Sequence, residues 1–318
     1  MTMQFYDVSR ALLRTATATI EPDCGGLTSW TDGTAAWWQP DATIAKVHMV
    51  FMQHLDVGFT DTTRGVCDSY FDDVFPRAME TAAELRRRQG AASFTWTSFP
   101  WLVREYLDGA AGCATRKRTA AELARVRVAI TNDDIVWHAN ALNSFLELYD
   151  SDLFADSLSQ RDALNRDFGK THGSICGKQT DVPGMSIAAV PILAAKGVQA
   201  MHIGYNGACK LPEELPPLFR WRHNASGAEL VVMVEPGYGR MVLAGPVALA
   251  FMFVGDNGLP PTADAVQHLC IYVAVHLSPT PPSLSSLLPR PLPLTPSPPL
   301  FSLSLQTHVH PPIQNRTG

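Results

Sequence analysis

Short apolar runs alternate with segments of helical periodicity along most of the chain. The run from Val47 to Met52 is typical of a buried strand, and residues 69–89 carry apolar side chains at helical spacing. Pro76 predicts a break or a late start in that helix. Further strands are expected at 94–96, 134–138, 174–180, 199–203, 229–234 and 249–254, and further helices at 100–107, 119–128, 142–153 and 186–196. This alternation predicts an α/β fold with a parallel sheet or barrel.

Composition divides the chain into three segments. Residues 1–44 show no clear periodicity, residues 45–269 carry the alternation of strands and helices, and residues 270–318 are rich in Pro, Ser and Leu. So much proline excludes helix or central strand and predicts polyproline or disorder in the tail. The tail is either a ligand for another module or sequence outside any evolved domain. Because the helix that opens at 260–262 is predicted to stop near Gln267, where the low-complexity sequence follows, we expect the α/β domain to be incomplete.

Polar side chains recur where the predicted strands end. His54 and Asp56 directly follow the first apolar run, and residues two apart in an extended segment point the same way. His138, Asp181 and Asp256 follow later strands. The carboxyl ends of parallel strands share one edge of a sheet or one mouth of a barrel. We therefore expect these side chains to converge at a common site.

Three of these residues form a donor set of one imidazole and two carboxylates: His54, Asp56 and Asp181. Such a set suits zinc or a similar divalent ion with open positions for a substrate. A structural alternative stays open for Asp181, since this side chain could instead cap the helix expected from Ser186.

The remaining bulk properties restrict the class of protein. The chain has 318 residues, a formal net charge of -5 and 46% hydrophobic residues. Mild acidity gives no reason to expect nucleic acid, and no apolar run approaches the roughly 20 residues of a membrane helix. Residues 1–20 lack the basic start and long apolar core of a secretory signal, which makes the cytoplasm the default expectation. The 6 cysteines are scattered without a Cys-x-x-Cys pair and are expected to be mostly reduced thiols.

Three short motifs occur in an order and spacing that resemble a known family. They are His-x-Asp-x-Gly-Phe at 54–59, Thr-Asp-Val-Pro-Gly-x-Ser at 180–186 and Gly-Asp-Asn at 255–257. These resemble motifs of glycoside hydrolase family 38, the retaining α-mannosidases. With Trp-His-Ala at 137–139 and His-Ile-Gly-Tyr-Asn at 202–206, the resemblance is closer to an uncharacterised branch of that superfamily. It covers about residues 45–267, the family's N-terminal catalytic domain.

The resemblance implies a fold, a cofactor and a reaction. The fold would be an irregular parallel (β/α)7-type barrel, here incomplete, which the family follows with a helical bundle and β-sandwiches. Zn²⁺ would be held by His54, Asp56, Asp181 and a later histidine. Asp181 would also be the nucleophile that forms a glycosyl-enzyme intermediate on an α-linked carbohydrate substrate.

The resemblance also assigns substrate-binding positions, with some departures. Phe59 replaces the family's tryptophan and keeps an aromatic face for the sugar, and Asn257 stands where the mannosidases tend to carry a second aspartate. An amide cannot donate a proton as an acid does, so Asp256 beside it is the candidate acid/base. His202 and Tyr205 follow another strand; they are expected near the substrate together with His138, although a strand-end histidine can instead be structural.

Activity and alternative functions stay open at this point. Because the family's fourth ligand is missing and Asn257 replaces an acid, we expect little or no hydrolase activity from this chain. A metal-dependent carbohydrate deacetylase would need a His-x-x-x-His pair, which the sequence lacks. A non-catalytic carbohydrate-binding remnant is the third possibility. The sequence does not specify the sugar or the oligomeric state.

Overall fold

The computed structural model describes residues 2–6, 12–17, 46–89, 93–109, 112–170, 175–209, 215–238, 241–244 and 247–277. The exclusion of helix from the tail is wrong for residues 270–277, because the helix α8 (Ala263–Leu277) continues through them with further apolar residues. The rest of the tail, from 278 onward, lies outside the described residues, and so does most of the segment 1–44. Within that segment, β1 (Thr2–Tyr6) and β2 (Leu12–Thr17) pair as an antiparallel two-stranded sheet. The division into three segments stays a prediction.

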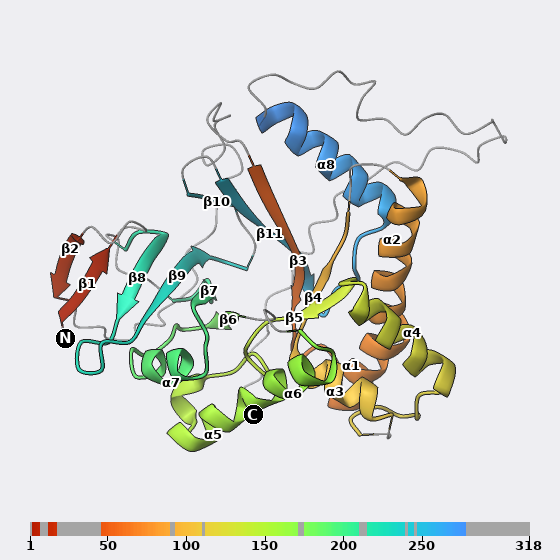
Figure 1. Ribbon diagram of the computed structural model, residues 1–318, viewed down its shortest axis with the longest axis horizontal. Coiled ribbons are helices and arrows are strands. Elements are labelled where there is room, and N and C mark those ends of the chain that lie inside the picture. The colour runs from red at the N-terminus through yellow and green to blue at the C-terminus, as the bar shows by residue number, and fades with distance from the viewer. Residues whose placement is uncertain are drawn as a thin grey trace, which may run out of the picture.

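Most of the other strands belong to two sheets with parallel centres, which confirms the predicted α/β fold (Figure 1). In the first sheet, β11, β3, β4 and β5 run parallel and β10 joins antiparallel at the edge. In the second, β6, β7 and β9 run parallel and β8 is the antiparallel edge. The bounds are β3 (Lys46–His54), β4 (Trp96–Ser98), β5 (Ile135–Trp137), β6 (Cys176–Val182), β7 (Ala200–Tyr205), β8 (Leu218–Arg222), β9 (Glu229–Pro236), β10 (Met241–Ala244) and β11 (Val247–Asp256).

The two sheets meet where β5 ends and β6 begins. The Ala139 N–H donates a 2.8 Å hydrogen bond to the Cys176 carbonyl, which continues the strand order from the first sheet into the second. Among the described residues, the strands do not close into a barrel. The parallel strands still follow one another in chain order from β3 to β9, so their carboxyl ends lie on the same side of the fold.

Helices cover the outer faces of both sheets (Figure 1). They are α1 (Thr63–Ser69), the π-helical turn η1 (Tyr70–Val74), α2 (Phe75–Arg88), α3 (Pro100–Asp108), α4 (Ala120–Thr131), the 3₁₀ turn η2 (Leu146–Leu148), α5 (Ser151–Ser157), α6 (Ser159–Asp167), α7 (Ala189–Ala195) and α8 (Ala263–Leu277). The helix expected over 142–153 is wrong for most of its length. It begins only at Ser151, where the Asp150 carboxylate accepts from the Leu153 N–H and caps the first turn.

The helix expected over 69–89 continues through Pro76 by means of the π-helical turn. The Phe75 N–H donates to the Tyr70 carbonyl, five residues back, and Pro76 then lies in the first turn of α2. The missing proline N–H costs little there, since it would have no partner within the new helix. The predicted break is therefore a widened turn rather than a helix end.

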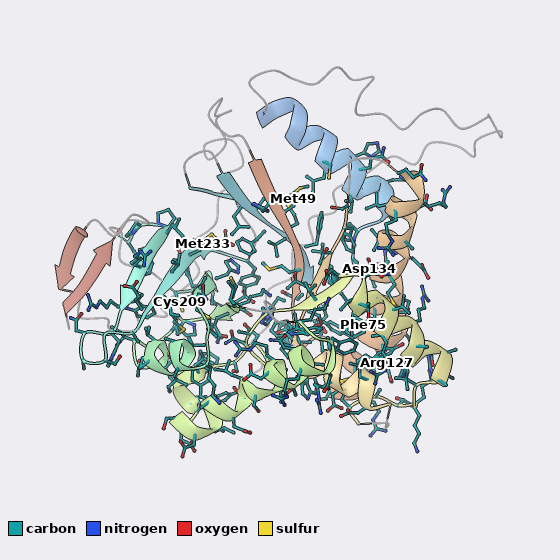
Figure 2. The ribbon with its side chains drawn as sticks, viewed as in Figure 1. Met49, Phe75, Arg127, Asp134, Cys209 and Met233 are labelled. Carbon is teal, nitrogen blue, oxygen red and sulfur yellow. A yellow bond between two sulfur atoms is a disulfide. The ribbon has the colours of Figure 1, made fainter. Side chains whose placement is uncertain are left out.

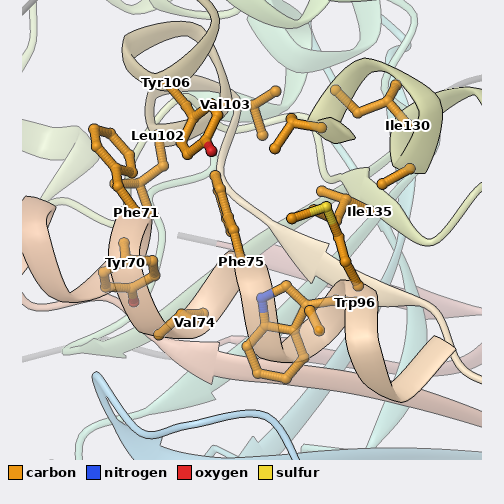
Figure 3. Close-up of a cluster of buried hydrophobic side chains, with 14 of the residues drawn as sticks. Tyr70, Phe71, Val74, Phe75, Trp96, Leu102, Val103, Tyr106, Ile130 and Ile135 are labelled. Carbon is orange, nitrogen blue, oxygen red and sulfur yellow. The ribbon is translucent and has the colours of Figure 1, made fainter. Parts of the chain in front are cut away.

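Two hydrophobic clusters form the core, one on each sheet. The larger packs α1, η1, α2, α3 and α4 against β3, β4 and β5, and it includes large buried side chains such as Phe75, Trp96 and Tyr106 (Figure 3). The smaller joins α5 and α7 to β7, β8 and β9. Figure 2 shows the side chains that fill the interior, among them Phe75 of α2 and Met233 of β9. No helix in the described part of the chain is long and apolar enough to cross a membrane.

Cys67 and Cys113 form a disulfide that joins α1 to the loop before α4. The expectation of reduced thiols is wrong for this pair. Packing brings the two residues to a Cα–Cα distance of 5.9 Å although they are 46 positions apart, a proximity that sequence spacing does not reveal. A hydrogen bond from the Thr115 N–H to Asp68 (2.7 Å) fastens the same loop to the same helix. Cys176 and Cys270 are free thiols.

A layer of polar side chains is buried between the two sheets, below the strand ends. Lys178 of β6 donates a 2.7 Å hydrogen bond to the Gln53 carbonyl of β3 and lies over the Phe99 ring. His202 of β7 stacks on a phenylalanine of β11 and contacts the Glu235 carboxylate of β9 at 2.6 Å. Burial lowers the pKa of Lys178 to about 7. We call Lys178, His202, Glu235 and His138 the interior polar layer.

The Lys178 amine makes stability depend on pH. The pKa in the folded protein is about 7 against a usual value of 10.5, so the unfolded chain binds more protons between these values. The free energy of unfolding should therefore rise with pH across this window, by up to about 1.4 kcal/mol per pH unit. Lys178→Met should remove that rise and stabilise the chain at pH 7 by about 1–4 kcal/mol.

Urea unfolding at several pH values between 6.5 and 10 measures this effect. The exposed Lys117, changed in the same way to Met, is the control and should leave the pH profile unaltered. An unchanged pH slope in Lys178→Met would show that the buried amine is not what sets it.

Candidate metal and carboxylate site

His54 is the centre of the site. It ends β3 with 2% of its side chain exposed, and its Nδ1 lies 2.9 Å from the Thr180 hydroxyl of β6. This contact turns the opposite ring nitrogen, Nε2, toward the carboxylates. Asp56, two residues further along the same extended segment, places Oδ1 3.0 Å from that Nε2. The predicted pairing of His54 with Asp56 on one face is therefore present.

Asp181 reaches the same imidazole from the second sheet. A β-bulge interrupts the pairing of β6 with β7 between Thr180 and Val182, and Asp181 within it adopts a left-handed conformation with φ +58°. Bulges of this kind re-aim a side chain, and strained conformations of non-glycine residues gather at functional sites. The result is a distance of 3.4 Å from Asp181 Oδ2 to His54 Nε2.

The alternative role of Asp181 as a helix cap is not what the structure has. The helix that follows, α7, begins at Ala189 after Ala188, and no side chain caps it. Asp181 Oδ1 instead accepts hydrogen bonds from the Asn206 amide (2.6 Å) and from the Tyr238 hydroxyl. Only Oδ2 then faces the imidazole.

The surroundings of Asp181 favour its ionised form. Partial burial raises the pKa of this carboxyl, but the hydrogen bonds from His54, Tyr238 and Asn206 outweigh burial and bring the pKa below its usual value. Burial and the bond to Asp181 raise the pKa of Tyr238, which keeps its hydroxyl a hydrogen-bond donor at neutral pH. Asp181 is thus a carboxylate with one oxygen held and one oxygen available.

Asp256 joins the site from β11. The ladder between β11 and β3 is irregular between Phe253 and Asp256, after which Asp256 pairs with His54. Burial, together with the charges of Asp56 and Asp181, raises the pKa of the Asp256 carboxyl. Two irregular strands, β6 and β11, therefore each direct one aspartate toward the end of β3.

His54, Asp56 and Asp256 form a group that could hold a metal ion, since their ligand atoms all lie within 4.8 Å of one another. The set predicted from the sequence had Asp181 in place of Asp256. Ligands about 2.0–2.1 Å from a tetrahedral zinc ion lie about 3.3–3.5 Å apart. The separations of 3.0 Å and 3.4 Å from His54 Nε2 to Asp56 and Asp181 are close to that value. A nitrogen and carboxylate donor set of this kind fits zinc or a similar divalent ion, and the role of Asp181 as a ligand stays a prediction.

The other predicted site residues lie in different surroundings. Phe59 is 79% exposed in the loop after β3, where its ring is open to solvent. His138 and His202 belong to the buried interior polar layer, where burial lowers the pKa of each imidazole. Tyr205 packs against the smaller core cluster, and Asn257 contacts the loop that carries Asp56. A role for these residues in binding substrate stays a prediction.

Comparison with known proteins shows a likeness in fold alone. No protein-family model matches the chain, and no curated protein matches its sequence. An α-mannosidase from Enterococcus faecalis V583 is 10% identical, with a TM-score of 0.56 over 72% of this chain and 27% of its own. A 4-α-glucanotransferase from Thermococcus litoralis is also 10% identical, with a TM-score of 0.48 over 73% and 37%. The chain thus spans little more than a quarter to a third of these proteins. At such low identity the likeness to the α-mannosidase shows a shared α/β fold and assigns no activity.

Sequence reasoning missed the residues that hold the carboxylate and imidazole in place. Thr180 bonds to His54, Asn143 accepts from the Thr180 N–H (2.7 Å), and Tyr238 binds Asp181. Tyr238 lies in the Pro-Gly-Tyr turn after β9, so the rule that strand ends carry the site could have found it. Thr180 and Asn143 give no such signal, because their contacts depend on how the two sheets meet.

The Thr180 hydroxyl should control the orientation of His54. Thr180→Val keeps the shape of the side chain but leaves Nδ1 of a buried imidazole without this partner, which should lower the free energy of unfolding by about 1–3 kcal/mol. Loss of a partner that orients a ligand should also weaken zinc binding about 10–100-fold.

Denaturant unfolding and a zinc titration against a competing chelator measure the two effects. Thr180→Ser is the matched control, because it retains the hydroxyl and should stay close to wild type in zinc affinity. Equal zinc affinity for Thr180→Val and Thr180→Ser would contradict the role given to the hydrogen bond.

Proposed function

We propose that this chain carries a metal-dependent glycoside hydrolase site that acts on α-linked sugars by a retaining mechanism, with Asp181 as nucleophile. The observation that carries the proposal is the arrangement of carboxylates from β6, β11 and the loop after β3 around one imidazole, His54. The glycosidase-like fold and the resemblance of the motifs at 54–59, 180–186 and 255–257 to those of the α-mannosidases support it.

His54 Nε2 and carboxylate oxygens of Asp56 and Asp256 would hold the metal ion. Zn²⁺ bound there would supply a Lewis acid that anchors neighbouring hydroxyl groups of a sugar. The group has one buried, one half-buried and one exposed member, so a sugar could approach from the side of Asp256. The exposed aromatic ring of Phe59, on the loop after β3, is available for stacking on a sugar.

Asp181 would attack the anomeric carbon and form a glycosyl ester, which water then opens. Its ionised state suits the first step, since the neighbouring hydrogen bonds lower the pKa of this carboxyl. Tyr238 and Asn206 hold Oδ1, which leaves Oδ2 to form the new bond. The left-handed backbone at Asp181 fixes the direction from which that oxygen approaches.

A metal ligand and a general acid are exclusive roles for Asp256, because a carboxylate that binds a metal carries no proton. The proposal places Asp256 at the metal, and Asn257 beside it cannot act as an acid. General acid catalysis contributes about 10²–10⁴-fold to such reactions. We therefore expect slow hydrolysis of ordinary glycosides and faster reaction of substrates whose leaving group needs no proton.

Covalent trapping separates the nucleophile from the metal ligands. The wild-type chain with Zn²⁺ should react with 5-fluoro-α-mannosyl fluoride and gain one sugar on Asp181, detected by peptide mass spectrometry. Asp181→Asn should lose the label yet still bind zinc. Asp56→Ala and Asp256→Ala should each weaken zinc binding more than about 100-fold, since even partners outside the ligand set change affinity 10–100-fold.

Asp133→Asn is the matched control, because Asp133 is also an aspartate in a left-handed conformation (φ +60°) but lies at the end of α4. The Asp133→Asn variant should be labelled on Asp181 and should bind zinc as tightly as wild type. A labelled residue other than Asp181, or undiminished zinc affinity in both Asp56→Ala and Asp256→Ala, would falsify the proposed assignment.

Two other functions give different outcomes in the same assays. A metal-dependent deacetylase would release acetate from an acetylated sugar and would gain no covalent label. A non-catalytic carbohydrate-binding protein would bind an α-mannoside without label or acetate release. Zinc binding with labelled Asp181 distinguishes the proposed glycosidase from both.

A further inference from the structure

Asn257 follows β11 in a left-handed conformation with φ +50°. Its backbone N–H donates a 2.9 Å hydrogen bond to the His54 carbonyl, one position beyond the regular ladder between β11 and β3. Asparagine tolerates this conformation better than most residues, since its short polar side chain can bond locally. The conformation places the Asn257 amide beside the segment after β3, which carries Asp56.

The Asn257 side chain uses its whole hydrogen-bonding capacity on neighbouring parts of the protein. Oδ1 accepts from the Asp56 N–H (3.1 Å) and from the Tyr70 hydroxyl (3.2 Å). Nδ2 donates to the Asp56 carbonyl (2.8 Å) and to the Thr60 hydroxyl (2.7 Å). A primary amide has two lone pairs and two N–H donors. All four are occupied, so none is left for a substrate.

The two hydrogen bonds between the Asn257 side chain and the Asp56 backbone resemble those of a residue pair in an antiparallel sheet. The Asn257 Nδ2 donates to the Asp56 carbonyl and its Oδ1 accepts from the Asp56 N–H, as the backbone of a paired residue would. The side chain thus fixes the backbone on both sides of Asp56, at the point where β3 has ended and Gly58 (φ +88°) turns the chain. The direction of the Asp56 carboxylate follows from that backbone.

We propose that Asn257 is a positioning residue, which holds Asp56 toward His54 so that the two can bind a metal ion together. This inference rests on the proposed function for the metal ion and takes Asn257 out of substrate binding. The chain of contacts extends to Tyr70, which is 1% exposed and begins the π-helical turn before α2. π-helical turns inside α-helices are frequent at functional sites, and this one lies directly behind the metal group.

The chemistry of an amide explains why Asn257 is not an aspartate. A carboxylate could accept from the Asp56 N–H and from Tyr70, but it could not donate to the Asp56 carbonyl. It would also add another negative charge beside Asp56 and Asp256, which already raise the electrostatic cost of the site without a metal. The amide supplies both halves of the pairing and adds no charge.

Asn257→Gly tests the inference most directly. Glycine accepts a positive φ without strain, so this change removes the side-chain bonds while the backbone conformation is kept. Zinc affinity should fall about 10–100-fold, as for other partners that orient ligands. Gln89→Gly is the matched control, because Gln89 is an exposed residue with nearly the same φ of +51° at the end of α2, and its affinity should equal wild type.

Two further variants extend the test. Asn257→Asp should weaken zinc binding at least as much as Asn257→Gly, whereas Tyr70→Phe removes one hydrogen bond to Oδ1 and should weaken it about 2–10-fold. The measurements are competition titrations with Zn²⁺ and the visible spectrum of bound Co²⁺, which reports the ligand geometry. Tyr70→Phe keeps the ring in the core and gives a result even where a change at Asn257 prevents folding.

The outcomes separate this inference from the proposed function. A wild-type chain that binds no zinc would overturn both. Tight zinc binding by wild type, with unchanged affinity and an unchanged Co²⁺ spectrum in Asn257→Gly and Tyr70→Phe, would overturn the role of Asn257 alone. If Asn257→Gly kept the zinc affinity of wild type but lost the covalent labelling of Asp181, Asn257 would contact the substrate and would not position the metal ligand.

Discussion

The hydrogen bond between His54 and Thr180 is the contact on which the site depends. These residues are 126 positions apart and belong to different sheets, which do not close into a barrel among the described residues. At the carboxyl ends of the strands, this hydrogen bond fixes the imidazole on β3 against β6, the strand that carries Asp181. One layer below, Lys178 crosses the same gap to the Gln53 carbonyl. Polar contacts rather than apolar packing therefore set the relative position of the two halves at the site, and the distances between His54 and the carboxylates follow from them.

Electrostatic repulsion is the second constraint. Asp56, Asp181 and Asp256 gather around one imidazole, and the pKa of Asp256 is raised by burial first and then by the negative charges of the other two aspartates. Hydrogen bonds from Tyr238 and Asn206 stabilise the negative charge of Asp181, but these two residues make no such bonds to Asp56 or Asp256 among the described contacts. A divalent cation would balance this charge, which is the electrostatic argument for the metal ion in the proposed function.

The fold class and the general position of the site could be predicted from the sequence for one reason. Parallel strands end on the same side of a fold, so apolar runs followed by polar residues predicted both the α/β class and the convergence of His54, Asp56 and the later aspartates. Regular periodicity fails where the ladders are irregular. The irregular pairings that aim Asp181 and Asp256 leave no pattern in the sequence, so the alternation of strands and helices alone does not give the distance of either carboxylate from His54.

Other features depend on contacts between distant parts of the chain and were likewise hidden. The pairing of Cys67 with Cys113 required knowledge of how α1 packs against the loop before α4. Asn257 was interpreted as a departure from a catalytic pattern, because its four hydrogen bonds become visible only when β11 lies beside β3. Sequence periodicity predicts the helices, the strands and the side of the fold on which the site lies. The disulfide and the contacts of Asn257 depend on how distant segments pack together.

The left-handed backbone at positions 181 and 257 has a consequence for how this protein can evolve. Few side chains other than those of Gly, Asn and Asp accept such a conformation at low cost. The codons of Asn and Asp differ by a single base. At both positions, selection therefore has a choice between an amide and a carboxylate that one nucleotide change can reverse without disturbing the backbone. Lineages of this fold can gain or lose a charged group beside His54 far more readily than they can rebuild the strands that present it.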